Sequence, residues 1–157
     1  MEKKFNSIET VTNGAQVLRF AGRLARLYHE GINFDTLGLA SEGYEKLTVR
    51  DLWGGVLYCH DKGLVSQADD GAIHLAPEVD SLIENRLLEA TALALENICI
   101  VRDGILEYDD FMDNDNEEVL FAAMTYNLPE ESFPIIRELL LEWHLVRLDG
   151  TGNIVAE

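Results

Sequence analysis

The sequence predicts a mainly α fold with small β-hairpins, of the α+β class, built from two similar units in tandem. Residues 47–76 have a helical apolar pattern followed by two short apolar segments around Ala-Asp-Asp-Gly, which indicates a helix that leads into a β-hairpin. Residues 128–157 align with this stretch without a gap after a shift of 81 positions. The identical pairs in this alignment are Leu47/Leu128, Leu64/Leu145, Val65/Val146, Gly71/Gly152 and Ile73/Ile154.

These pairs occupy positions that a hairpin needs, namely the strand starts, the turn glycine and the returning strand. We therefore interpret the alignment as a tandem repeat, with one unit in residues 1–77 and the other in residues 78–157. The length of 157 residues and the hydrophobic content of 47% suit a chain that buries a core.

Charge divides the two units. The chain has 12 Lys or Arg and 29 Asp or Glu, a net charge of −17. Residues 1–77 hold eight basic and ten acidic residues, a net charge of −2, whereas residues 78–157 hold four arginines and nineteen acidic residues, a net charge of −15. Because such a field repels the phosphate backbone, direct nucleic-acid binding is disfavoured, above all for the second unit.

The sequence contains neither a run of eighteen apolar residues nor an apolar segment behind the N-terminal lysines. We therefore expect no membrane span, no secretory signal and a cytoplasmic location. Cys59 and Cys99 lie in apolar surroundings without metal-type spacing, which favours two buried free thiols over a disulfide or a metal pair.

The first unit is predicted to begin with an amphipathic helix over residues 14–31. Thr12 and Asn13 offer N-cap side chains, and Gly31 is suited to end the helix. The apolar stripe contains Val17, Ala21, Leu24 and Tyr28. A short strand over residues 32–34 and an irregular helix over residues 36–44 should follow.

A third helix is predicted between Thr48, an N-cap residue, and Lys62-Gly63, a C-terminal signal. Two adjacent glycines, Gly54 and Gly55, disfavour a helix interior, so we expect another helix to cross closely there. The first hairpin pairs residues 64–67 with residues 72–75. The resulting order of helix, strand, helix, helix and hairpin resembles a winged helix.

The second unit is predicted to follow Pro77 and to contain one long helix over residues 79–100, which packs on the first unit or forms a homodimer surface. A strand over residues 105–108, an acidic loop over residues 109–118, a helix from Pro129 and a hairpin over residues 145–156 complete it. The expected core consists of Trp53, Leu57, Leu64 and Ile73 in the first unit and Leu140, Trp143, Val146 and Ile154 in the second.

No motif indicates an enzyme, a metal site or a cofactor. An EF-hand reading of the acidic segment would need a glycine where Glu118 stands. The histidines lack metal-ligand spacing, and no Ser/His/Asp or Cys/His arrangement is present. The glycine pairs match no phosphate-binding pattern.

Two charged sets are candidate binding surfaces. The acidic set suggests a protein partner with a basic surface, and it contains Asp109, Asp110, Asp113, Asp115, Glu117, Glu118, Glu130 and Glu131. The basic set suggests nucleic-acid contact, against the alternative of a solvated helix face, and it contains Arg19, Arg23, Arg26, Arg50 and Lys62.

Tandem winged helices, strong acidity and no catalytic signature together resemble the kite-type accessory subunits of SMC chromosome-organising complexes. The resemblance covers architecture only, and it implies a non-enzymatic adaptor that dimerises and binds a kleisin segment. Two alternatives stay open: a small acidic DNA mimic or phage-type inhibitor, and a winged-helix transcription regulator that uses Arg50 on its third helix.

Overall fold

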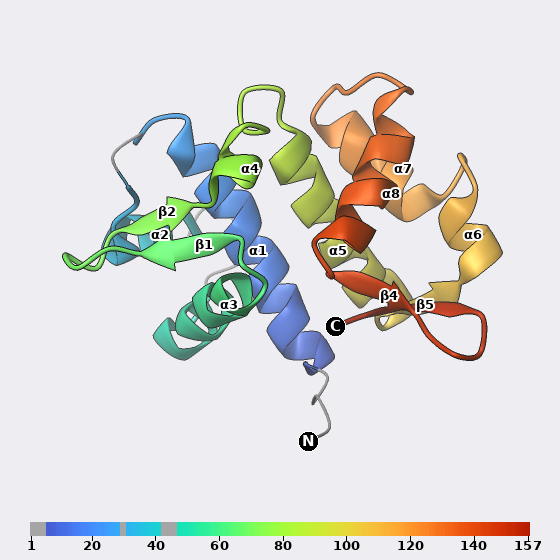
Figure 1. Ribbon diagram of the computed structural model, residues 1–157, viewed down its shortest axis with the longest axis horizontal. Helices are drawn as coiled ribbons and strands as arrows, with labels where there is room; N and C mark the ends of the chain where they lie inside the picture. The colour runs from blue at the N-terminus through green and yellow to red at the C-terminus, as the bar shows by residue number, and fades with distance from the viewer. Residues whose placement is uncertain (1–5, 29–30, 42–46) are drawn as a thin grey trace.

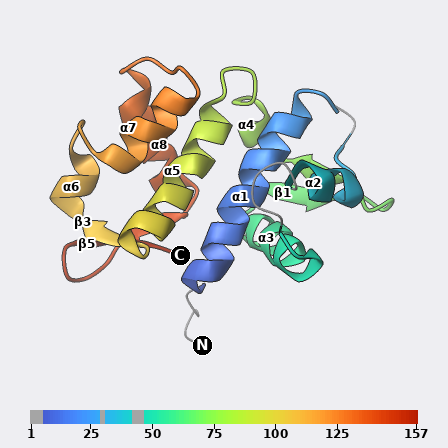
Figure 2. The same cartoon turned by 180° about the vertical axis from the view of Figure 1, so that it is seen from behind.

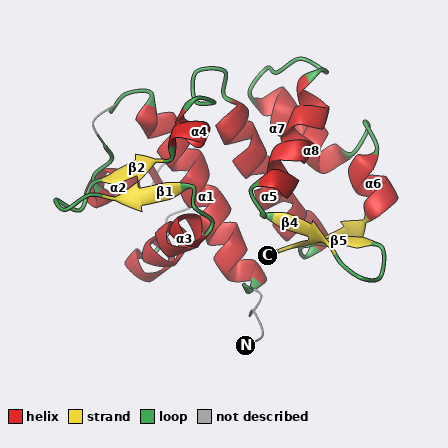
Figure 3. Ribbon diagram, in the orientation of Figure 1, coloured by secondary structure: helices red, strands yellow, loops and turns green. Residues whose placement is uncertain are grey.

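The computed structural model describes residues 6–28, 31–41 and 47–157. Within these ranges the chain is mainly helical with two small antiparallel sheets, which confirms the predicted fold class (Figures 1 and 3). The elements of the first half are α1 (Ile8–Ala25), α2 (Phe34–Ser41), α3 (Val49–Asp61), β1 (Val65–Gln67) and β2 (Ile73–Leu75). Those of the second half are α4 (Pro77–Asp80), α5 (Leu87–Arg102), β3 (Ile105–Glu107), α6 (Tyr108–Met112), α7 (Glu117–Thr125), α8 (Ser132–Glu142), β4 (Val146–Leu148) and β5 (Asn153–Ala156).

Helix α1 begins earlier than the sequence pattern predicts. Its N-cap is Ser7, whose hydroxyl accepts a hydrogen bond from the backbone N–H of Thr10 at 3.2 Å. The prediction of an N-cap at Thr12 or Asn13 is wrong, because both residues lie inside the helix. Thr12 instead donates its hydroxyl proton to the carbonyl of Ile8, one turn earlier, at 2.7 Å.

A close crossing of α1 and α3 depends on two glycines. A Cβ atom on Gly55 would lie 2.6 Å from the carbonyl oxygen of Asn13, and one on Gly14 would overlap the ring of Tyr58. The crossing predicted at the glycine pair is thus confirmed for Gly55. Gly54 has nothing within 4 Å of such an atom, so the prediction is wrong for that residue.

Helices α1 and α5 lie side by side in the middle of the molecule and run in opposite directions (Figures 1 and 2). Two ion pairs fix their register: Arg19 with Glu96 at 3.3 Å, and Arg26 with Glu89 at 2.8 Å. A step toward the C-terminus of α1 therefore corresponds to an equal step toward the N-terminus of α5. This pair of helices joins the two halves of the chain.

The long helix predicted over residues 79–100 is wrong as a single element. Helix α4 ends at Asp80, turns follow, and α5 starts at Leu87. Arg86 takes a left-handed backbone conformation with φ of 61°, which no helix interior allows. The side chain of Asn85 then accepts a hydrogen bond from the N–H of Leu87 at 3.1 Å, which starts the new helix.

The two hairpins occur where the repeat predicts them, and their registers coincide. Val65 pairs with Leu75 in the first ladder, and Val146 pairs with Ala156 in the second, each residue 81 positions later. The turn residues Gly71 and Gly152 have φ values of 87° and 86°. The same shift thus relates both the strand pairing and the turn conformation.

Each hairpin also pairs with a segment from earlier in its half, a single residue in the first half and a strand in the second. Ile32 forms an isolated bridge with Ile73 of β2, and Leu106 of β3 pairs with Ile154 of β5. The order in the larger sheet is β3-β5-β4, so the earlier segment pairs with the second strand of the hairpin in both halves. The strand predicted over residues 32–34 is wrong beyond the bridge at Ile32, because Phe34 begins α2.

The buried apolar residues of both halves form one continuous core. The predicted core residues of the second half are all buried, as are Leu64 and Ile73 in the first. Trp53 and Leu57 are wrong, because 39% and 59% of their surfaces are exposed. Helix α3 instead turns Leu52, Val56 and Cys59 inward. Trp53 stacks on Phe34 at the surface, with ring centroids 4.3 Å apart.

None of the helices in the described ranges combines the length and the apolar character that a membrane span requires.

Candidate functional site

The acidic segment is not the loop that the sequence predicts. Residues 108–112 form α6, a short turn follows, and α7 begins at Glu117. Asn116 caps α7 by accepting a hydrogen bond from the N–H of Val119 at 3.1 Å. Glu117 and Glu118 occupy the first turn of α7, where the helix dipole favours negative charge.

Glu118 is a correction to the predicted acidic surface, because it is buried. Its carboxylate forms an ion pair with the guanidinium group of Arg102 at the end of α5. Arg102 also pairs with the half-buried Asp110 at 2.8 Å. These two carboxylates therefore hold α6 and α7 against α5 rather than face a partner.

The other acidic candidates remain at the surface: Asp109, Asp113, Asp115, Glu117, Glu130 and Glu131. The arginines of the second half offset this charge only in part, since Arg147 is paired with Glu157 at 2.8 Å. Arg137 is buried and donates hydrogen bonds to the carbonyl of Asp113 and the side chain of Asn114. This side of the molecule therefore presents a strongly acidic surface.

An apolar groove of about 220 Å³ lies between α5 and α7, beside these acids. Helix α5 contributes Leu93, Asn97 and Val101, and α7 contributes Phe121 with Glu117 and Thr125. Both sets follow an i, i+4, i+8 spacing, so each marks one helix face. The exposed fractions of Val101 and Phe121 are 66% and 54%.

The walls of this groove are fixed to each other. The side-chain amide of Asn97 donates a hydrogen bond to the carbonyl of Glu118 at 3.1 Å, directly between the two helices. Ile100 and Met124, the sequence neighbours of Val101 and Thr125, are exposed as well, with exposed fractions of 58% and 59%. The result is a preformed groove with exposed apolar walls and a carboxylate, Glu117, at its edge.

A second apolar face lies on α3. Val49, Trp53 and Leu57 are exposed at i, i+4, i+8 spacing, and a hollow of about 170 Å³ separates Trp53 and Leu57 from the first hairpin. The α5–α7 groove is the better candidate, because its apolar walls adjoin the carboxylate of Glu117, whereas the described residues that line the hollow on α3 include no carboxylate.

The structure does not bring the basic candidates onto one face. Arg19, Arg23 and Arg26 line a pocket at the C-terminal half of α1, whereas Arg50 lines another with Thr10 at the N-terminal end of that helix. Thr10 and Arg23 are separated by roughly 20 Å along the helix axis. Lys62 donates a hydrogen bond to the backbone carbonyl of His144, in the other half. These residues therefore form no continuous strip for a nucleic-acid backbone.

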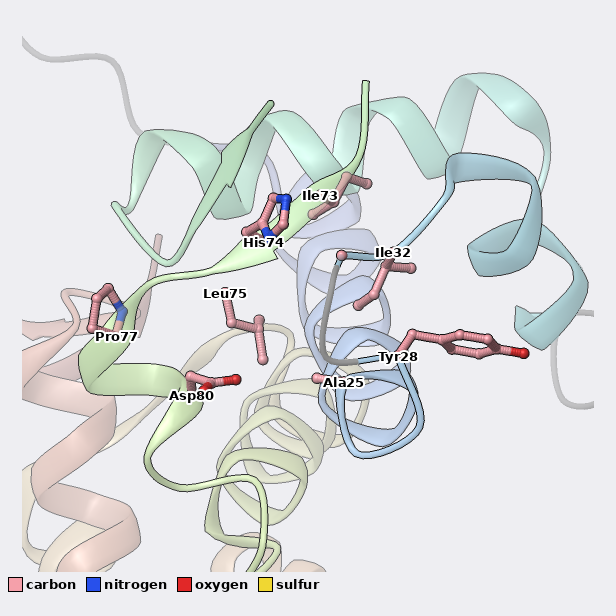
Figure 4. Close-up of a pocket in the computed structure, with 9 residues that line it drawn as sticks. Ala25, Tyr28, Ile32, Ile73, His74, Leu75, Pro77 and Asp80 are labelled. Atoms are coloured by element: carbon pink, nitrogen blue, oxygen red, sulfur yellow. The ribbon is translucent and has the colours of Figure 1, made fainter. Parts of the chain in front are cut away.

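Figure 4 shows a pocket of about 260 Å³ between α1, β2 and α4. The titratable residues that line it are Tyr28, His74 and Asp80. The ring of Tyr28 points away from the other two in this view. An imidazole and a carboxylate without a nucleophile beside them do not form a catalytic set. This pocket carries no chemistry that we assign.

The two cysteines are free and buried, as predicted. Cys59 donates from its Sγ to the carbonyl of Gly14 at 3.4 Å, and burial raises the pKa of this thiol to about 12. A thiol so strongly protonated is a poor nucleophile. In the described parts of the chain, no group of three His, Cys, Asp or Glu side chains could hold a metal ion.

Comparisons of the chain with protein families, with curated proteins and with solved structures found no match. Function is therefore inferred from the geometry of the sites alone.

Sequence reasoning missed the α5–α7 groove. The helical spacing of Leu93, Asn97 and Val101 was visible, but the apolar residues of α5 are spread around the whole helix. Only the position of α7 shows which face of α5 is left open. The signal that could have indicated it is the matching i, i+4 spacing of Phe121 and Thr125 on the next apolar helix.

Proposed function

We propose that the protein is a non-enzymatic interaction module whose α5–α7 groove binds an amphipathic helix, with basic flanks, from a partner protein. The observation that supports this proposal is the position of exposed Phe121 and Val101 in an apolar groove beside a surface rich in carboxylates. Contiguous exposed apolar surface with a polar rim is typical of protein-binding sites.

The shape of the groove favours a helical partner segment. A groove between two helices can accept apolar anchors that recur at i, i+3 or i+4, and i+7 on an amphipathic helix. Complete burial of one large apolar side chain contributes about 1.5–3 kcal/mol. Phe121 and Val101 can therefore supply a large part of the affinity if the partner covers both.

Charge favours a basic partner. The net charge of residues 78–157 is −15, and Asp109, Asp113 and Asp115 lie exposed in the segment that leads into α7. Complementary charge outside the apolar contact mainly accelerates association. Lysines or arginines on the flanks of the partner helix would be attracted to this side at low salt, and salt would weaken that attraction.

The architecture that we propose for the module is two winged-helix-like units. Support comes from the element order of each half, the equal hairpin registers and the earlier segment that pairs with the second hairpin strand, which is Ile32 in one half and β3 in the other. The resemblance to kite-type subunits remains a prediction. A transcription regulator has less support, because Val49, Trp53 and Leu57 make much of the exposed face of α3 apolar around Arg50, whereas bases are read mainly by polar and basic side chains.

The test uses a fluorescein-labelled synthetic peptide of about 14 residues, with leucines on one helical face and lysines on the other. Fluorescence anisotropy should show binding to the wild-type protein. Phe121→Glu should weaken it at least roughly tenfold, as expected when an interface anchor is lost. The matched control is Leu57→Glu, an equally exposed residue on α3, which should bind like the wild type.

Equal affinities for wild type and Phe121→Glu would show that the groove is not the site. The same experiment distinguishes the proposed groove from the alternative of an acidic DNA mimic. A mimic would depend on carboxylates alone, so an Asp109→Asn, Asp113→Asn, Asp115→Asn variant would abolish binding while Phe121→Glu would leave it unchanged.

A further inference from the structure

Four arginines surround one pocket of about 240 Å³ that lies apart from the groove. Arg19 and Arg23 lie in the last turns of α1, Arg26 is its C-cap residue, and Arg86 precedes the first turn of α5. Glu89 is the carboxylate among the residues that line this pocket. A third of the 12 basic residues of this acidic chain thus meet at one place.

Two of these arginines form ion pairs with buried carboxylates. The carboxylate of Glu89 lies 2.8 Å from Arg26, and that of Glu96 lies 3.3 Å from Arg19, and both carboxylates are buried. Burial raises the pKa of Glu89, although all four arginines act in the opposite direction. All four arginines line the pocket, and the two buried carboxylates hold Arg19 and Arg26 in place.

Arg86 is a residue of the second half that lines the pocket, and its left-handed backbone conformation costs stability. Its φ of 61° is uncommon for a residue with a side chain, and glycine or asparagine is the usual choice at such a position. Helix geometry therefore does not explain an arginine here. The side chain, which is exposed and lines the pocket, offers the better reason.

We propose that this pocket binds the phosphate group of a small phosphorylated molecule, or inorganic phosphate. A carboxylate can accept two parallel N–H bonds from one guanidinium group. A phosphate group has three terminal oxygens and a charge near −2, so it can accept hydrogen bonds from several guanidinium groups at once. The N-terminus of the 16-residue helix α5 adds a favourable dipole on the same side.

The size of the pocket and the range of electrostatic forces agree with this ligand class. A volume of about 240 Å³ is below the roughly 300–1,000 Å³ of sites for drug-sized ligands, so it suits a phosphate with a small substituent. The Debye length at physiological salt is about 8 Å. The distant acids of the −17 chain are therefore largely screened from an anion that contacts the arginines directly.

The experiment measures binding of inorganic phosphate and of glycerol 3-phosphate by isothermal titration calorimetry, with matched ionic strength in sodium chloride. Three variants are compared with the wild type: Arg86→Gly, Arg23→Gln and Arg50→Gln. Arg86→Gly removes a guanidinium group and relieves the left-handed strain, so the variant should fold at least as stably as the wild type. Arg50→Gln removes an exposed arginine of another pocket and is the control.

We expect saturable binding to one site in the wild type and in Arg50→Gln, weakened roughly tenfold or more in Arg86→Gly and in Arg23→Gln. Tighter binding of glycerol 3-phosphate than of phosphate would assign the site to a phosphorylated metabolite, and the reverse to free phosphate. The absence of saturable binding, or equal weakening in all three variants, would overturn the proposal.

A binding experiment with duplex DNA distinguishes a small phosphate ligand from the phosphates of a nucleic-acid backbone. Duplex DNA that binds the wild type, competes with inorganic phosphate and is lost in Arg86→Gly would show that the arginines contact a polymer backbone, and this too would overturn the small-ligand proposal. Retention of phosphate binding without any DNA binding supports it.

Discussion

The hydroxyl group of Tyr58 donates a hydrogen bond of 2.8 Å to the main-chain carbonyl of Glu157, which lies 99 positions later in the sequence. Both residues are buried, and they connect α3 of the first half with the residue that follows β5 in the second. Four residues further along, Lys62 contacts the carbonyl of His144. The end of α3 is thus a second junction of the halves, in addition to the α1–α5 pair.

The junction gives the first prediction. Tyr58→Phe keeps the ring but removes the donor to a buried carbonyl, and a buried acceptor that loses its partner costs about 1–3 kcal/mol. Urea unfolding should show this loss in the free energy of unfolding. Tyr28→Phe, at a half-exposed ring, is the control and should change it little. An unchanged stability in Tyr58→Phe would mean that the hydrogen bond is not formed in solution.

A loss of stability in alkali is the second prediction. Burial raises the pKa of Cys59 to about 12 and that of Cys99 to about 11, from 9.0 for an exposed thiol. It also raises the pKa of Tyr58. Above pH 9 the unfolded chain loses thiol protons that the folded chain retains, so stability present below pH 9 decreases as the pH rises.

The expected decrease in the free energy of unfolding between pH 9 and pH 10 is about 1 kcal/mol for each thiol. Urea unfolding at the two pH values measures it. A Cys99→Ala variant should show a smaller difference between the two pH values than the wild type. Equal stability of the wild type at both pH values would place the thiols in contact with water.

The repeat gives the third prediction. Leu64 and Leu145 are related by the 81-residue shift, and only 2% and 0% of their surfaces are exposed. Truncation of either leucine to alanine should cost about 2–5 kcal/mol, measured by thermal or urea unfolding. Leu57→Ala, at a leucine that is 59% exposed, should change stability by less than about 0.5 kcal/mol. A large loss in Leu57→Ala would place this residue in a covered contact instead.

Two adjacent glycines give the fourth prediction, with effects of opposite sign. Gly54→Ala adds a methyl group to open space in the interior of a helix and should stabilise the protein by up to about 1 kcal/mol. Gly55→Ala would bring a methyl group within 2.6 Å of the carbonyl oxygen of Asn13, so it should destabilise the α1–α3 crossing. Circular dichroism melts of the two variants would decide, and the same sign of change in both would contradict the packing described.

Much of the fold was predictable because local signals agreed with the tertiary structure. The turn glycines, the apolar strand starts and the helix signal at Lys62-Gly63 place both hairpins correctly. The start of α1 was missed because Thr12 has the same capping chemistry as Ser7. The break before α5 was missed because Arg86 carries no sequence signal for a left-handed conformation.

The sites were less predictable because they depend on distant partners. Glu118 looks like any surface acid until Arg102, sixteen positions away, is placed beside it. The arginine pocket joins Arg86 to a helix that ends about sixty residues earlier, at Ala25. The apolar side chains of Trp53 and Leu57 suggest that these residues belong to the core. The face of α3 that is buried is instead set by how α1 packs against it.

The most direct test of the proposed function is an amide chemical-shift titration of the uniformly ¹⁵N-labelled protein with the leucine–lysine peptide. We predict that the largest shifts occur on α5 and α7, at Leu93, Asn97, Val101, Phe121 and Thr125, with smaller shifts in the acidic residues before α7. Shifts that concentrate on α3 around Trp53, or that spread evenly over all acidic residues, would contradict the assignment of the α5–α7 groove as the binding site.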